Sequence, residues 1–125
     1  MLRFWRSGTS LGERGERLAA RTLRRNGYSI LERNAHLGRY EIDIIAREED
    51  TVVFVEVKTR RADDVVQPEE NVGHEKQRHI IRASEVYRAR LVEDETYYRF
   101  DVVSVVMPEL GKPRVTIFRD AFQEA

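Results

Sequence analysis

The chain of 125 residues has no cysteine, few prolines and lysines, and no apolar run long enough to span a membrane. The absence of cysteine excludes disulfide scaffolds, cysteine-ligated zinc, iron–sulfur clusters and thiol catalysis. Residues 1–10 contain arginines but lack the apolar stretch of a signal peptide. We therefore expect a soluble cytoplasmic protein with no membrane partner.

Charge is balanced overall but unevenly distributed. The 22 basic and 22 acidic residues cancel, and 19 of the basic residues are arginine. Residues 1–40 hold nine arginines and three glutamates, a net charge of +6, whereas residues 41–125 have a net charge of −6. Neutrality therefore excludes a uniformly basic polyanion binder, but it permits a nucleic-acid surface on the first third.

The order of elements predicts an α/β fold. Without repeats or linkers, we expect one domain at residues 11–120, with an arm at 1–10 and a tail at 121–125. Ser10 as N-cap, Glu13 in a capping box and Gly27 as the stop predict a helix over 11–26. The other predicted elements are strands at 28–33, 39–46, 51–58, 98–107 and 114–118, and a helix over 72–92. The order αβββαββ predicts an α/β sandwich with a central mixed sheet.

The first helix has two faces. Its small and apolar stripe is predicted to contain Leu11, Gly12, Gly15, Leu18, Ala19 and Leu23, and its opposite face contains Arg14, Arg17, Arg21, Arg24 and Arg25. Glu16 lies seven residues before Leu23 and therefore points toward the core boundary. An inward carboxylate needs a metal, a cation or hydrogen bonds. The alternative is a rim glutamate paired with a neighbouring arginine.

The second and third strands carry the candidate catalytic residues. Alternation places Asp43 beside Glu56 and Lys58 if the turn at 48–50 joins an antiparallel pair, and it puts Ile42, Ile44, Val53, Val55 and Val57 on the other face. Asp43 and Glu56 can hold Mg²⁺ or Mn²⁺, and Glu16 either completes the shell or holds a second ion. Lys58 would orient water and contact phosphate during phosphodiester hydrolysis. The alternative is a solvent-facing strand with an ion pair.

A lysine falls within the apolar stripe of the second helix, which consists of Val72, Ile80, Ala83, Tyr87 and Leu91. Lys76 either extends its amine to solvent from a core edge or reaches the carboxylates. In the second case it is a second phosphate contact or a structural counter-ion, and the adjacent Gln77 can join it.

Five segments together resemble the YraN-type family of uncharacterised bacterial proteins. They are Gly12-x-x-Gly15-Glu16, Glu41 to Ala46, Val53 to Arg60, Lys76, and Arg99 to Val102. The family is similar to PD-(D/E)XK nucleases and archaeal Holliday-junction resolvases. The resemblance implies a restriction-endonuclease-like α/β/α fold, a Mg²⁺-dependent endonuclease activity, and catalytic positions at Glu16, Asp43, Glu56 and Lys58. Tyr40 departs from the pattern, because the family usually has glycine there.

The leading hypothesis is a metal-dependent nuclease acting on DNA, with branched or structured DNA as a candidate substrate. The expected nucleic-acid contacts are Arg14, Arg17, Arg39, Arg60, Arg61, Lys76 and Gln77. Two alternatives stay open: a non-catalytic nucleic-acid-binding protein of the same fold, and a protein-interaction module whose oppositely charged halves join chains. A homodimer also stays open.

Overall fold

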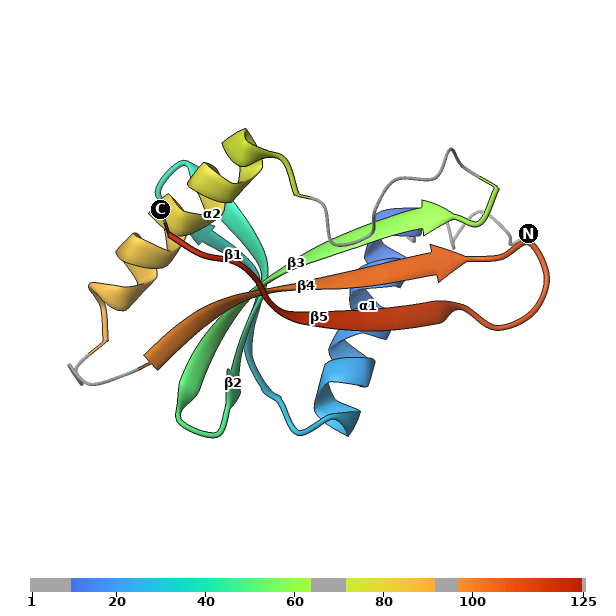
Figure 1. Ribbon diagram of the computed structural model, residues 1–125, viewed down its shortest axis with the longest axis horizontal. Coiled ribbons are helices and arrows are strands. Elements are labelled where there is room, and N and C mark those ends of the chain that lie inside the picture. Colours follow the sequence, from blue (N-terminus) through green and yellow to red (C-terminus); the bar gives the residue numbers. More distant parts are fainter. Residues whose placement is uncertain (1–9, 64–71, 92–96, 125) are drawn as a thin grey trace, which may run out of the picture.

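The computed structural model describes residues 10–63, 72–91 and 97–124 (Figure 1). Two helices and five strands follow one another in the predicted order, which confirms the mixed α/β class. They are α1 (Leu11–Arg25), β1 (Ser29–Leu37), β2 (Tyr40–Glu48), β3 (Thr51–Arg61), α2 (His74–Arg88), β4 (Tyr97–Met107) and β5 (Arg114–Phe122).

The strands form one mixed sheet in the order β1-β2-β3-β4-β5. β1, β2 and β3 are an antiparallel meander. β3 and β4 run parallel, from the pair Thr51–Tyr97 to the pair Arg61–Met107. A parallel pair cannot be joined by a hairpin, and the connection between these two strands contains α2. β5 returns antiparallel to β4 and forms an edge of the sheet.

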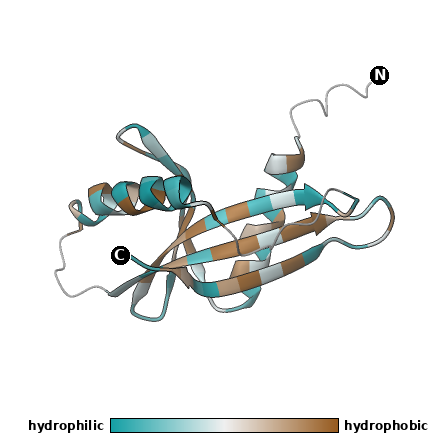
Figure 2. Cartoon of the chain, turned by 45° about the horizontal axis from the view of Figure 1, so that its top comes forward, coloured by the Kyte–Doolittle hydropathy of each residue, from teal (hydrophilic) through white to brown (hydrophobic). Residues whose placement is uncertain are grey.

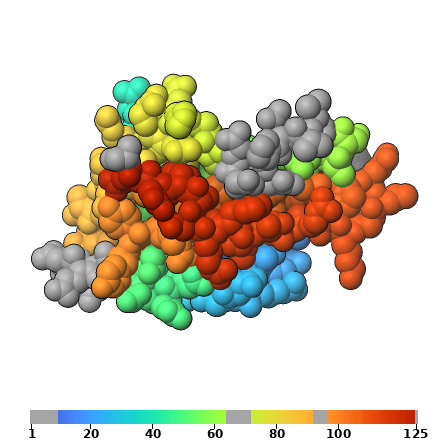
Figure 3. All heavy atoms as spheres, in the orientation of Figure 1, coloured from blue at the N-terminus to red at the C-terminus, as the bar shows by residue number. Residues whose placement is uncertain are grey.

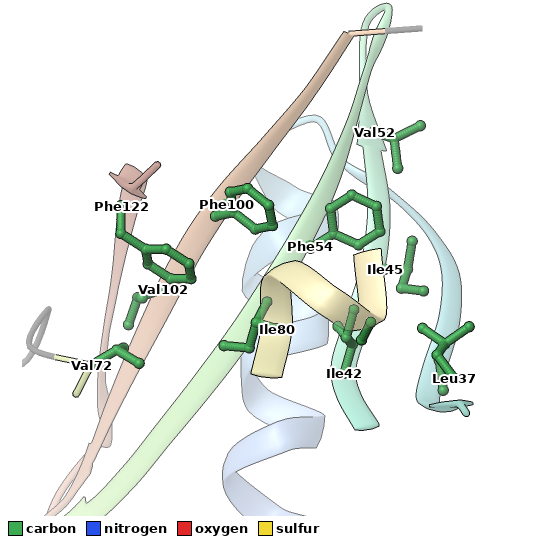
Figure 4. Close-up of a cluster of buried hydrophobic side chains, with 12 residues drawn as sticks. Leu37, Ile42, Ile45, Val52, Phe54, Val72, Ile80, Phe100, Val102 and Phe122 are labelled. Carbon is green, nitrogen blue, oxygen red and sulfur yellow. The ribbon is translucent and has the colours of Figure 1, made fainter. Parts of the chain in front are cut away.

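The two helices cover opposite faces of the sheet. In the space-filling view β5 crosses the front, with α2 above it and α1 below it (Figure 3). Hydrophobic residues are concentrated along the strands (Figure 2). The core on the side of α1 includes Ala19, Ala20, Leu23, Ile44, Val53, Val55 and Val103. The core on the side of α2 includes Ile42, Phe54, Ile80, Ala83, Phe100, Val102 and Phe122 (Figure 4).

Helix α1 begins and ends as its sequence predicts. The Ser10 hydroxyl accepts from the Glu13 N–H at 3.0 Å, and the Glu13 carboxylate accepts from the Ser10 N–H at 2.7 Å. Gly27 follows the helix with a φ of +93°, in the left-handed region that favours glycine. The five arginines of the opposite face are exposed, as predicted. The buried stripe differs from the predicted one at two positions. Gly12, which the predicted stripe contains, is exposed, and Ala20, which it does not contain, is buried.

Several element boundaries differ from the prediction. β1 runs to Leu37 because its last residues pair with β2. β5 runs to Phe122, whose ring stacks on Phe100 with the centroids 5.1 Å apart, so residues 121 and 122 belong to the sheet rather than to a tail. Helix α2 ends at Arg88 rather than at residue 92. Most of the predicted arm at residues 1–10 lies outside the described residues. Neither described helix is long and apolar enough to cross a membrane.

A buried polar network binds β4 to three other parts of the fold. The Asp101 carboxylate is fully buried and accepts from the Tyr28 hydroxyl at 2.7 Å, from the Arg99 Nε at 2.8 Å and from the Asp120 N–H at 2.9 Å. The Arg99 guanidinium also donates to Glu48 at 2.7 Å. Burial and the hydrogen bond to Asp101 raise the pKa of Tyr28. The network thus joins the end of β2, the start of β1, β4 and β5.

Candidate active site

The predicted site lies where β2 and β3 separate. The last pair between the two strands is Ile44 with Val55, whereas β3 continues along β4 to Arg61. Beyond that last pair, the backbone N–H of Val57 donates to Oδ2 of Asp43 at 2.8 Å. A carboxylate oxygen therefore takes a hydrogen bond from the strand backbone, and Asp43 is held at the opening between the strands.

The alternation predicted for β2 is wrong at this point. Ile42 packs in the core on the side of α2, and Ile44 packs in the core on the side of α1 with Val53 and Val55. Regular alternation would put Ile42 and Ile44 on one face. The neighbouring strand is also irregular here, because Asn34, opposite Asp43 in register, has a φ of +53°. The backbone irregularity moves Asp43 off the face that period-two counting assigns to it.

Asp43 and Glu56 form a carboxylate pair. Burial, the charge of Asp43 and a hydrogen bond with the Asp43 side chain together raise the pKa of Glu56 to about 8. Lys76 and Lys58 act against this shift but do not overcome it. The Lys76 Nζ lies 3.9 Å from Oε1 of Glu56, whose side chain is 15% exposed. The two lysines therefore compensate only part of the negative charge of the Asp43–Glu56 pair.

Glu16 of α1 faces the same region from the helix side. Its side chain is 12% exposed, and Oε1 accepts from Asn34 Nδ2 at 2.8 Å and from the Arg33 guanidinium at 3.4 Å. Burial and the charge of Asp43 raise the pKa of Glu16. Glu16 lies at the core boundary as predicted, and it also pairs with an arginine, as the alternative expected; that arginine is Arg33 of β1.

Gly15 allows α1 to approach β3 closely. A Cβ added at Gly15 would lie 1.9 Å from Oγ1 of Thr59, well inside van der Waals contact. Only glycine leaves room for Thr59 at this helix position. The close approach places Glu16, the next residue of α1, at the edge of the site.

A pocket of about 720 Å³ lies between α1 and the strands. α1 and β1 contribute charged and amide groups, β2 contributes one carboxylate, and β3 contributes backbone and a hydroxyl. Its lining includes Glu16, Arg17, Arg33, Asn34, Asp43 and Thr59. Of the predicted catalytic residues, Glu16 and Asp43 line this pocket, whereas Glu56 and Lys58 are not among its lining residues. The pocket has room for a phosphodiester group beside Glu16 and Asp43.

The predicted catalytic residues are brought together only in part. Asp43 contacts Glu56, and Glu16 is coupled to Asp43 through charge. Lys58 affects the pKa of Glu56 through its charge. Within ranges 10–63, 72–91 and 97–124, no three histidine, aspartate or glutamate side chains converge into a group that could hold a metal. Direct ligation by Glu16 therefore stays a prediction.

The residues predicted to contact nucleic acid are spread over several elements. Arg17 lines the pocket, and Arg14 is exposed on the same helix. Arg60 and Arg61 end β3, on the strand that carries Glu56. The Gln77 amide donates to the backbone carbonyl of Val72 at 2.6 Å.

Arg39 and Tyr40 lie at the other side of the sheet from α1. The Tyr40 ring stacks on His79 of α2 with the centroids 4.8 Å apart, and the Arg39 guanidinium lies 5.6 Å from the Tyr40 ring centroid. Both residues line a separate groove beside α2. The bulky side chain at position 40 therefore packs against α2, while the pocket lies on the α1 side.

Sequence reasoning missed Arg33 and Asn34, the two β1 residues that bind Glu16. Both lie where a strand end was predicted. Asparagine tolerates the left-handed region better than most residues do, but a lone asparagine does not reveal that conformation.

These observations define a mixed α/β protein with an acidic pair where two strands diverge and with Lys76 of α2 beside one of the two carboxylates. The chain belongs to the uncharacterised protein family UPF0102, whose family model matches residues 15–105. This confirms the YraN-type resemblance. The matched range contains Glu16, Asp43, Glu56, Lys58 and Lys76.

Relatives of the family match most of the chain. A UPF0102 protein of Chlorobium phaeobacteroides is 42% identical over 118 residues, covering 90% of this chain and 93% of the relative. A UPF0102 protein of Syntrophus aciditrophicus is 45% identical over 114 residues, covering 91% and 89%. A third, from Syntrophotalea carbinolica, is 48% identical over 96 residues, covering 77% and 78%.

Proposed function

We propose that this protein is a metal-dependent nuclease that hydrolyses phosphodiester bonds in DNA. The observation that carries the proposal is the Asp43–Glu56 pair, in which burial and the second carboxylate raise the pKa of Glu56 to about 8. Such a pair is unfavourable when both groups are ionised. It is favourable when a cation compensates it, and the pocket beside it has room for a phosphate.

The donor chemistry suits Mg²⁺ or Mn²⁺. Asp43 and Glu56 supply hard oxygen ligands, and Glu16 is the further candidate. When bound, the cation supplies Lewis acidity and lowers the pKa of a coordinated water.

The chain's own residues position the reacting groups. The Val57 N–H holds Asp43 in place at 2.8 Å. Lys58 contacts the scissile phosphate and orients the attacking water. Lys76 balances charge at Glu56, from which its Nζ lies 3.9 Å away. Each lysine thus offsets negative charge that increases in the transition state.

DNA binding is proposed to depend on phosphate contacts rather than on base-specific readout. The candidate contacts are Arg14, Arg17, Arg39, Arg60, Arg61, Lys76 and Gln77. Of these, Arg17 of α1 lines the pocket. Affinity should therefore fall steeply as the salt concentration rises.

The test is cleavage of branched, single-stranded and duplex DNA with Mg²⁺ or Mn²⁺. Lys58→Ala should lower the cleavage rate by about a hundredfold or more, because a charge that stabilises the transition state is lost. Lys112→Ala, at an exposed lysine between β4 and β5, is the matched control and should cleave at the wild-type rate. Absence of cleavage with either metal on every substrate, or unchanged cleavage by Lys58→Ala, would contradict the proposal.

A non-catalytic nucleic-acid-binding protein is the second candidate. It is favoured by the lack of a preformed three-ligand group among the described residues. In that case wild-type protein binds DNA without cutting it, and Glu56→Ala binds as tightly or more tightly because a repulsive charge is removed.

A further inference from the structure

Two neighbouring residues of β1 bind the same oxygen of Glu16 in unequal ways. The Asn34 amide donates to Oε1 at 2.8 Å, whereas the Arg33 guanidinium donates to it at 3.4 Å. A distance of 3.4 Å is beyond the usual range for a strong hydrogen bond. The neutral amide therefore fixes the position of Glu16, and the charged guanidinium makes a weaker contact.

Asn34, which is exposed like Arg33, makes the shorter of the two contacts with Glu16. Its φ of +53° lies in the left-handed region, which asparagine adopts more readily than most residues do. It stands opposite Asp43 in the register of β1 and β2. This conformation holds the amide against Glu16 of α1, so Glu16 keeps its place beside Asp43 without Arg33.

Arg33 is the exchangeable partner. Its side chain is 37% exposed, compared with 12% for Glu16, and it lines the pocket together with Arg17. A guanidinium can donate two parallel hydrogen bonds to a phosphate, an arrangement stronger than one long contact to a carboxylate. A phosphodiester in the pocket therefore offers Arg33 a better partner than the one it has.

We propose that Arg33 is a phosphate-binding residue of this pocket, resting on Glu16 in the free protein and moving to a backbone phosphate of bound DNA while Asn34 retains Glu16. The inference rests on the proposed function, because it requires a phosphodiester in the pocket. It adds to that function a substrate contact on β1 and a competition between Glu16 and the phosphate for one guanidinium.

The first test is DNA affinity, measured by fluorescence anisotropy with a labelled four-way junction, a duplex and a single strand. The chelator EDTA is present, so binding is read without cleavage. Arg33→Gln should weaken binding about tenfold, as expected for losing one charge-assisted contact. The slope of log affinity against log salt should become shallower by about 0.7 to 0.9, the contribution of one phosphate.

Arg90→Gln is the matched control, since it removes the same charge from an exposed position just beyond the C-terminal end of α2. It should bind like the wild type. If Arg33→Gln also binds like the wild type, the role of Arg33 is overturned while DNA binding stands. If the wild-type protein binds none of the DNAs, both this inference and the proposed function are overturned.

A second variant tests the competition without altering Arg33. Glu16→Gln weakens the resting contact, so it should bind DNA more tightly than the wild type. The double variant Glu16→Gln/Arg33→Gln should lose that gain, because the released guanidinium is gone. If Glu16→Gln raises the DNA affinity equally with Arg33 and with Arg33→Gln, the gain comes from removing a negative charge near DNA, and the exchange is overturned. The exchange is also overturned if Glu16→Gln does not raise the affinity.

Discussion

Burial and a neighbouring charge act together on Glu56. Burial is the largest cause of its raised pKa, the charge of Asp43 is the next, and Lys76 and Lys58 oppose both. A carboxylate in this position is more stable when it is protonated or bound to a metal cation than when it is ionised without a compensating charge. The chemistry proposed for the site depends on that preference.

This preference predicts a pH dependence of stability in the metal-free protein. The pKa of Glu56 is about 8 in the folded protein, against an ordinary 4.5. Because the folded pKa is the higher one, the stabilisation is complete below the unfolded pKa and is lost as the pH rises through 8. The free energy of unfolding should therefore fall across this window by on the order of a few kcal/mol.

Urea unfolding in EDTA at a series of pH values measures the effect. Glu56→Gln should remove most of the decline and be the more stable protein at pH 8. Glu109→Gln, at an exposed glutamate between β4 and β5, should retain the wild-type slope. An unchanged slope in Glu56→Gln would show that other groups titrate in this window.

Helix α1 depends on close packing against β3, where Gly15 lies against the side chain of Thr59. Gly15→Ala would put a Cβ 1.9 Å from Oγ1 of Thr59, so either the helix or β3 must move. We expect a loss of stability of about 1–3 kcal/mol, the usual cost of overpacking, despite alanine's better helix propensity. Displacement of Glu16 should also slow the proposed DNA cleavage.

Gly12→Ala provides the matched comparison on the same helix. Its Cβ would have only Ser10 Oγ nearby, at 3.9 Å, so the variant should be as stable as the wild type or slightly more stable. Thermal unfolding followed by circular dichroism measures both variants. Equal melting temperatures for the two would contradict the close-packing account.

The elements that sequence predicted best carry local signals. The capping box of Ser10 and Glu13 defines the start of α1, and valine alternation defines β3. The irregularity at Asp43 has no such signal, because period-two counting assumes a regular strand. The sequence therefore predicts that Asp43 lies beside Glu56, as found, but it predicts this from a regular strand, whereas β2 is irregular at Asp43.

At the scale of the whole molecule, the missed interactions are long-range. Tyr28 and Asp101 are 73 residues apart in sequence, and the buried hydrogen bond between them joins the start of β1 to β4. Glu16 reaches Asn34 across 18 residues and two elements. No local pattern encodes such contacts. Overall neutrality likewise conceals the exposed arginine face of α1, beside a pocket lined by carboxylates.

The measurement that tests the central claim most directly is calorimetric titration of Mn²⁺ into the wild-type protein and Asp43→Asn. Asparagine retains an oxygen that can accept from the Val57 N–H, so the variant removes charge with little change in shape. We predict saturable Mn²⁺ binding to the wild type that Asp43→Asn loses. No binding to the wild type, or the same isotherm for both proteins, would contradict the assignment of a metal-dependent site.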